Sequence, residues 1–146
     1  MNITESLKLQ ADLQAQIDQI QSRLLSCVRV EKGSKPLEKP ENLYKLQDKL
    51  LKQLGTAYSK MERAIYHAAY KDKSLIEMLS EQKILTLQIK LMKETLNKAN
   101  ELTSLEGVCY EPTIDIKLLE KQLFTLEELK RDIDSKIQSL FQITKV

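Results

Sequence analysis

Few residues in this chain could take part in catalysis or metal binding, and they are scattered. His67 is the single histidine, so a site that needs two imidazoles would have to be shared between copies. The cysteines Cys27 and Cys109 lack the C-x-x-C spacing of redox and zinc motifs. We expect both thiols to be reduced and to be buried as small apolar side chains.

Four carboxylates lie close together near the end of the chain, at Glu127, Glu128, Asp132 and Asp134. On a helix such a run is ordinarily an acidic, solvated face. A di-metal helical bundle would also need Glu-x-x-His pairs on facing helices, which one histidine cannot supply. The chain also lacks a glycine-rich phosphate loop, G-x-S-x-G and H-E-x-x-H. We therefore predict no catalytic, cofactor-binding or metal-binding residues, and no enzyme activity.

The composition favours long helices. The chain has 146 residues, of which 42% are hydrophobic and 30% charged, with only 3 Gly, 3 Pro and no Trp. Such a length is typical of one domain, and so few turn-forming residues leave little material for a β-sandwich. We predict a single all-α domain over residues 1–146.

The stretch from Leu75 to Ala99 shows the strongest periodicity. Its apolar seam alternates spacings of three and four residues: Leu75, Met78, Gln82, Leu85, Ile89, Met92, Leu96 and Ala99. Because further apolar residues flank this heptad seam, the helix needs cover on more than one side. We interpret it as the central helix of a bundle.

Start signals and similar apolar stripes define the other helices. The stripes consist of Leu13, Ile17, Ile20, Leu24 and Cys27 in the first helix, Leu43, Leu46, Leu50, Leu54, Ala57, Met61, Ile65 and Ala68 in the second, and Ile116, Leu119, Leu123, Leu126, Leu129, Ile133, Ile137 and Leu140 in the fourth. Pro40 suits the first turn of a helix, Ser74 with Glu77 forms a capping box, and Asp115 is a suitable N-cap. The predicted helices span residues 4–26, 40–69, 75–101 and 116–142, the last three being long. We expect them to form an antiparallel four-helix bundle with coiled-coil-like seams.

Two short segments alternate apolar and polar residues, at Val28–Val30 and Val108–Tyr110. We predict that they pair as a small two-stranded β ribbon at one end of the bundle. Such a ribbon would bring Cys27 and Cys109 together. Two buried thiols are then the favoured interpretation, and a redox switch is the alternative.

The second and third helices each carry a second apolar face. We predict that these faces form the interface of a homo-oligomer, through Tyr44, Leu51, Tyr58, Ile76, Leu79, Leu87 and Leu91. Tyrosines at the rim of a monomeric core are the alternative for the second helix. Gly55, in the middle of that helix, indicates a close approach of another helix.

Charge is unevenly distributed although the net charge is only +2. Residues 45–73 carry seven bases and three acids, whereas residues 101–134 carry nine acids and four bases. Opposite signs suggest contact between these segments, within a subunit or between subunits; two separate solvated faces are the alternative. The basic second helix gives nucleic-acid binding slight support. We consider it unlikely because acids dilute the basic residues and no arginine cluster is present.

No segment suggests export or membrane insertion. The first residues lack the pattern of a secretory signal, and no uncharged apolar run approaches the roughly 20 residues of a membrane span. We expect a soluble, cytoplasmic protein without a membrane span.

The chain resembles the septicolysin-like family of small bacterial helical proteins. The matching positions are Arg23-Leu24 before Val-x-Val, Gly33-x-x-Pro36-x-x-x-Pro40, Ser74-Leu75 to Leu79, and Thr113-Ile114-Asp115-Ile116 followed by Leu119, Gln122, Leu129, Arg131, Asp134, Ile137 and Gln138. The sequence departs from the family pattern at 62–65 and 141–143. The resemblance implies a long-helix fold, and its toxin label implies cytolysis.

We therefore predict a structural or interaction module that acts as a homo-oligomer. The expected partner is a second copy of the chain, with an unidentified protein as a further candidate. A membrane-active cytolysin, as the resemblance implies, and a weak nucleic-acid-binding protein are the alternatives.

Overall fold

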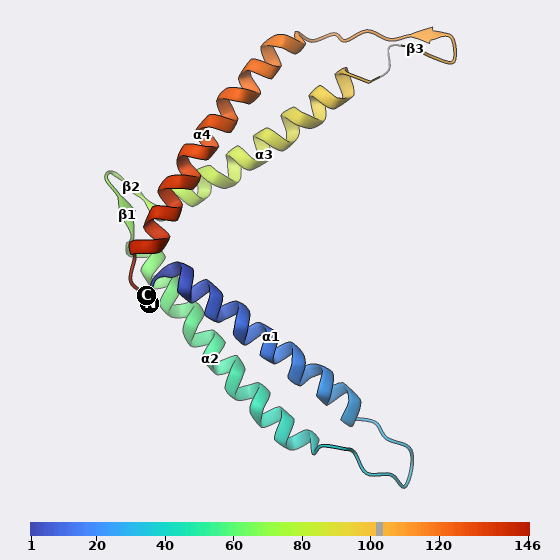
Figure 1. Cartoon of the computed structure of the whole chain (residues 1–146), viewed down its shortest axis with the longest axis vertical. Coiled ribbons are helices and arrows are strands. Elements are labelled where there is room, and N and C mark those ends of the chain that lie inside the picture. Colours follow the sequence, from blue (N-terminus) through green and yellow to red (C-terminus); the bar gives the residue numbers. More distant parts are fainter. Residues whose placement is uncertain (102–103) are drawn as a thin grey trace. The chain divides into compact units, whose positions relative to one another are not determined.

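The computed structural model describes residues 1–101 and 104–146 and contains four long helices (Figure 1). They are α1 (Ile3–Cys27), α2 (Pro40–His67), α3 (Leu75–Ala99) and α4 (Ile116–Ile143). Four short strands complete the elements: β1 (Ala69–Tyr70), β2 (Lys73–Ser74), β3 (Ser104–Leu105) and β4 (Val108–Cys109). The all-α prediction with four helices is confirmed, and every predicted helix boundary lies within two residues of the observed one.

The chain divides into two compact units. Unit 1 contains Met1–Ala68 and Phe141–Val146, and unit 2 contains Ala69–Leu140. Unit 1 therefore holds α1, α2 and the end of the chain, whereas unit 2 holds both β hairpins, α3 and most of α4. The prediction that residues 1–146 act as a single domain remains a prediction.

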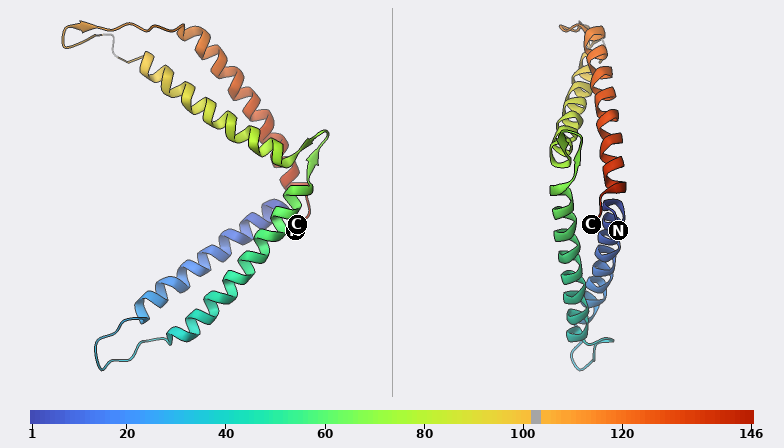
Figure 2. Two further views of the ribbon diagram at one scale, coloured as in Figure 1. Left: turned by 180° about the vertical axis from the view of Figure 1, so that it is seen from behind. Right: turned by 90° about the vertical axis from the view of Figure 1, so that its left-hand side faces the viewer.

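In unit 1, α1 and α2 run antiparallel and side by side (Figures 1 and 2). The predicted stripe of α1 is buried throughout, at Leu13, Ile17, Ile20, Leu24 and Cys27. These residues form two clusters with Leu43 and Leu54 of α2, and Leu50 packs against both clusters. One narrow seam thus holds the two helices together.

The two ends of the chain meet within unit 1. Asn2 caps α1 in a capping box, accepting from the Glu5 N–H at 2.8 Å while its own N–H donates to the Glu5 carboxylate at 2.8 Å. Asn2 also forms an isolated antiparallel bridge with Lys145, and the Val146 N–H donates to the Met1 carbonyl at 2.9 Å. These backbone bonds fix the last residues of the chain against the start of α1.

Helix α2 is covered more narrowly than its sequence predicts. Leu43, Leu54 and Ala57 of the predicted stripe are buried, but Leu46 is exposed. A single neighbouring helix covers less than the width of this stripe.

The close approach of another helix predicted at Gly55 is not observed, since a Cβ added there meets nothing within 4 Å. In unit 1, no helix approaches closely at this glycine.

In unit 2, α3 runs antiparallel to α4 (Figure 1). More residues are buried along α3 than along α4. Leu75, Met78, Leu85, Ile89 and Leu96 are buried along α3. On α4, Ile137 and Leu140 are buried, whereas Leu129 of the predicted stripe is 51% exposed. The cover of α4 in unit 2 is therefore partial.

The predicted ribbon between 28–30 and 108–110 is wrong in its pairing. A two-stranded antiparallel sheet is present, but β4 pairs with β3 in the register Ser104↔Cys109 and Leu105↔Val108. Glu106 and Gly107 both have positive φ, 51° and 79°, as a tight hairpin turn requires. Local pairing across two residues closes a far smaller loop than pairing with a segment 80 residues away.

A second hairpin, β1–β2, precedes α3, with Ala69↔Ser74 and Tyr70↔Lys73 in register.

The predicted burial of the two cysteines is correct for Cys27 and wrong for Cys109. Cys27 is buried in unit 1, whereas Cys109 is exposed on β4 of unit 2, and both are free thiols. The shared neighbourhood predicted for them rested on the ribbon that does not form.

Candidate interaction surface

The predicted interface residues of α2 form an exposed apolar stripe on unit 1. Tyr44, Leu51 and Tyr58 are seven residues apart and between 43% and 55% exposed. Gly55 lies between Leu51 and Tyr58 on the same face, since it is four residues after the one and three before the other. This stripe flanks the packed seam of α2, since each of its residues directly follows one of the seam residues Leu43, Leu50 and Ala57.

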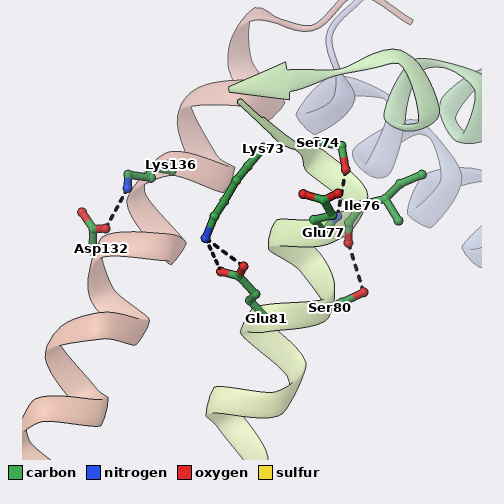
Figure 3. Close-up of polar contacts among 8 residues, drawn as sticks. All are labelled: Lys73, Ser74, Ile76, Glu77, Ser80, Glu81, Asp132 and Lys136. Carbon is green, nitrogen blue, oxygen red and sulfur yellow. Dashed lines mark hydrogen bonds and ion pairs between the residues drawn. The ribbon is translucent and has the colours of Figure 1, made fainter. Parts of the chain in front are cut away.

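The predicted interface residues of α3 are also mostly exposed. Ile76, Leu87 and Leu91 are between 42% and 51% exposed, whereas Leu79 is half-buried. Figure 3 shows the Ile76 side chain pointing away from α4. Because α2 and α3 belong to different units, the seven residues make up two separate apolar faces.

Unit 2 exposes further apolar residues that the predicted interface does not include. Ile84 of α3 and Leu118, Phe124 and Leu129 of α4 are exposed. A groove of about 420 Å³ lies between the two helices, lined by Ser80, Glu81, Ile84, Leu85, Gln88, Leu129 and Ile133. The spacing of Leu129 fits the α4 stripe and predicts a buried side chain, but packing against α3 alone leaves it 51% exposed.

Ion pairs cluster near the start of α3 (Figure 3). The Lys73 ammonium donates to both oxygens of Glu81, at 2.8 and 3.1 Å, and Lys136 contacts Asp132 at 2.9 Å. Ser74 caps α3 by accepting from the Glu77 N–H at 3.1 Å, which is one of the two hydrogen bonds of the predicted capping box. The Lys73–Glu81 and Ser74–Glu77 contacts fix the first turns of α3 beside the β1–β2 hairpin, whereas the Lys136–Asp132 pair lies within α4.

The carboxylates of the acidic run on α4 are largely engaged in ion pairs. Glu127 lies 3.5 Å from Lys93 of α3, and Asp134 accepts from Lys130 at 2.8 Å and from the Gln82 amide at 2.7 Å. The Lys130 hydrogen bond is the largest cause that holds the pKa of Asp134 below its ordinary value. Burial opposes it, and the Gln82 hydrogen bond, whose effect is smaller than that of burial, lowers the pKa further. Within 1–101 and 104–146, no group of three His, Cys, Asp or Glu residues could hold a metal ion.

His67 lies exposed at the end of α2, with its ring 5.3 Å from Tyr66 in an edge-to-face arrangement. It lines two shallow grooves of unit 1, of about 310 and 500 Å³. The larger groove also contains Lys60, Arg63 and Lys145. The larger groove therefore presents three cationic side chains.

The most voluminous groove described lies in unit 2 and was not predicted. It measures about 970 Å³ and lies between the end of α3 and the segment that follows β4. Its lining is Leu91, Glu94, Thr95, Lys98, Ala99, Glu101, Tyr110, Glu111, Pro112, Thr113 and Ile114. Leu91 is the residue that this groove shares with the predicted interface. No periodic signal could have found it, because it depends on where an irregular segment folds back.

Among the described residues, no helix is long and apolar enough to cross a membrane.

These observations define an all-α protein made of two long helical hairpins, each of which carries exposed apolar side chains. The chain belongs to a family of unknown function, DUF6847, which matches residues 10–142. It is also similar to the crystal structure of a functionally unknown conserved protein from Corynebacterium diphtheriae, with a TM-score of 0.86 and 20% sequence identity. That similarity covers 97% of this chain and 96% of the other, and it shows a shared fold. No curated protein matches the chain.

The resemblance to septicolysin-like proteins is wrong. The family match covers most of the positions on which the resemblance rested, and it assigns them to DUF6847. Those positions were single residues spread over helix starts, loops and stripes, which unrelated long-helix chains share. The cytolysis that the resemblance implied loses its basis with it.

Proposed function

We propose that the protein is a structural or interaction module that acts as a homo-oligomer and not as an enzyme. The observation that carries the proposal is the pair of exposed apolar faces, one on each unit. Six of the seven predicted interface side chains are at least 42% exposed although all are large and apolar. Exposed apolar side chains that recur along one face of a helix favour an interaction site.

Burial of these faces would contribute substantially to association. Full burial of a Leu, Ile or aromatic side chain stabilises by about 1.5–3 kcal/mol, and roughly half of that remains available at a half-exposed residue. Several such residues on each face can offset the entropy that two copies lose on association.

The charges favour a second copy as the partner. Unit 1 contains twelve basic and eight acidic residues, a net charge of +4, and unit 2 contains eleven basic and thirteen acidic residues, a net charge of −2. Unit 1 of one copy is therefore attracted to unit 2 of another, whereas two copies of unit 1 repel each other.

Charge substitutions on the two faces test this proposal. We expect Tyr58→Asp and Leu87→Asp to lower the oligomer mass in light scattering while the helical circular dichroism stays unchanged, because both side chains are exposed in the subunit. Tyr66→Asp is the matched control, since Tyr66 is 70% exposed and lies off the stripe. Oligomers of unaltered mass in both face variants would contradict the proposal.

A further inference from the structure

The loop between α1 and α2 presents one apolar side chain to solvent in full. Leu37 is 99% exposed, more than any other large apolar residue of the described chain. Its neighbours restrict the loop: Pro36 precedes it, and Pro40 opens α2. Because Leu37 is fully exposed, a partner that covers it would gain the whole burial free energy of a leucine side chain.

The loop is also fixed to the body of unit 1. Arg23 of α1 forms a two-pronged ion pair with Glu38, whose second contact is 3.0 Å long. Near the start of the loop, the Ser34 N–H donates to the Glu31 carbonyl at 2.9 Å, and Gly33 has a φ of 92°. The loop therefore loses little conformational freedom when it binds.

The groove of about 970 Å³ in unit 2 has complementary chemistry. Leu91, Ala99, Tyr110, Pro112 and Ile114 give it an apolar lining. Three carboxylates also line it, from Glu94, Glu101 and Glu111, against the single cation of Lys98. Lys98 contacts Glu101 at 2.9 Å. Among the lining residues, Glu94 and Glu111 therefore have no cationic partner.

The loop supplies the opposite charge. Lys32, Lys35 and Lys39 surround Leu37 in the sequence, and none of them forms an ion pair within the described ranges. The acid beside Leu37, Glu38, is engaged by Arg23. An apolar side chain within an excess of positive charge thus matches an apolar groove within an excess of negative charge.

We propose that the loop Lys35–Lys39 of one copy docks into the unit 2 groove of a second copy, with Leu37 as the buried side chain. This inference rests on the proposed homo-oligomer and assigns one of its contacts. Each copy carries one loop and one groove, so two copies can exchange the contact reciprocally in a closed dimer, or further copies can add in series.

A photo-crosslinking experiment tests the contact on the full chain. The amino acid p-benzoylphenylalanine replaces Leu37, the sample is irradiated, and the products are separated by mass and mapped by peptide sequencing. We expect crosslinked dimers whose second site falls at Leu91 or within 110–114. The control places the same probe at Leu25 of α1, which is 62% exposed and outside every groove described.

The outcomes separate this inference from the proposed function. Oligomers by light scattering with no Leu37 crosslink at the groove would overturn the docking contact and leave self-association standing. Monomers at every concentration would overturn both. A groove crosslink within a single 16.9 kDa chain would overturn the second copy as occupant, because the groove would then receive the loop of its own chain.

A matched pair of substitutions measures the contribution of the side chain. We expect Leu37→Ser to weaken association ten- to hundredfold because it removes the buried apolar side chain. High salt should weaken association of the parent chain and of the variant alike, because it screens the lysine–carboxylate attraction. Leu25→Ser is expected to change the dissociation constant less than threefold. Equal effects of the two substitutions would contradict a specific role for Leu37.

Discussion

Gly55 offers a test of how α2 is covered. It lies in the middle of the exposed stripe, and a Cβ added there would enter open space within unit 1. Glycine in a helix interior costs about 0.8–1.0 kcal/mol relative to alanine because it loses more backbone freedom on folding. Gly55→Ala should therefore stabilise the α1–α2 hairpin by about 1 kcal/mol.

Hydrogen exchange of α1 and α2 peptides measures this effect within unit 1. A gain of about 1 kcal/mol slows exchange through global opening about fivefold. Ala57→Gly is the matched control two positions away. Ala57 is 8% exposed, so this change removes a buried methyl group as well as helix propensity and should destabilise by roughly 2 kcal/mol.

The sign of the Gly55→Ala effect decides the interpretation. Faster exchange in Gly55→Ala, at a concentration where the protein has the mass of one chain, would refute the reasoning, because it would mean that another part of the subunit approaches Gly55. Weaker assembly combined with slower exchange would instead place Gly55 inside the contact between copies.

Three further predictions concern unit 2 and the cysteines. Ile89→Asp should destabilise unit 2 by about 3–5 kcal/mol, measured by urea unfolding, because it buries an unpaired charge in the α3 seam. Asp134→Asn should lower the free energy of unfolding by about 1 kcal/mol at pH 7, a small value because Asp134 is partly exposed. The variant should also lose less stability in acid than the parent chain does. The pKa of Asp134 is lower in the folded chain than its ordinary 3.8, so this stabilisation is present above pH 3.8 and is lost as the pH falls through the lower folded value. A thiol reagent should label Cys109 in the native protein and Cys27 only after unfolding, as peptide mass spectrometry would show.

Each of these predictions has a contradicting result. An unchanged urea midpoint in Ile89→Asp would remove α3 from the centre of unit 2. Equal acid sensitivity of Asp134→Asn and the parent chain between pH 5 and 2 would mean that the Lys130 and Gln82 contacts contribute nothing measurable. Native labelling of Cys27 at the rate of Cys109 would contradict the α1–α2 packing.

Helix positions could be predicted well from the sequence because local signals determine them. The α1 stripe, Pro40 in the first turn of α2 and the Ser74 cap of α3 each act within a few residues. Pairing of the extended segments could not be predicted in the same way. The alternation at 108–110 indicates a strand but not its partner. The partner is the neighbouring segment, because Glu106 and Gly107 adopt the positive φ values of a tight turn between the two strands.

Burial was predicted correctly only where one neighbouring helix suffices. Leu46 and Leu129 fit their stripes by spacing, yet both are exposed because each unit packs helices in pairs and covers a narrow seam. The second apolar faces at Tyr58 and Leu87, which the excess of apolar residues indicates, are exposed in the subunit, and their role as an interface stays a prediction. Leu37 and the groove around Glu111 gave no signal, since both depend on irregular segments whose placement no periodicity encodes.

The most direct test of self-association is the absolute mass in solution by light scattering after size exclusion, across a dilution series. We predict a mass of at least twice the 16.9 kDa of the chain that persists on dilution. A mass of 16.9 kDa at every concentration would contradict the account, because the apolar faces of α2 and α3 would then have no second copy to cover them.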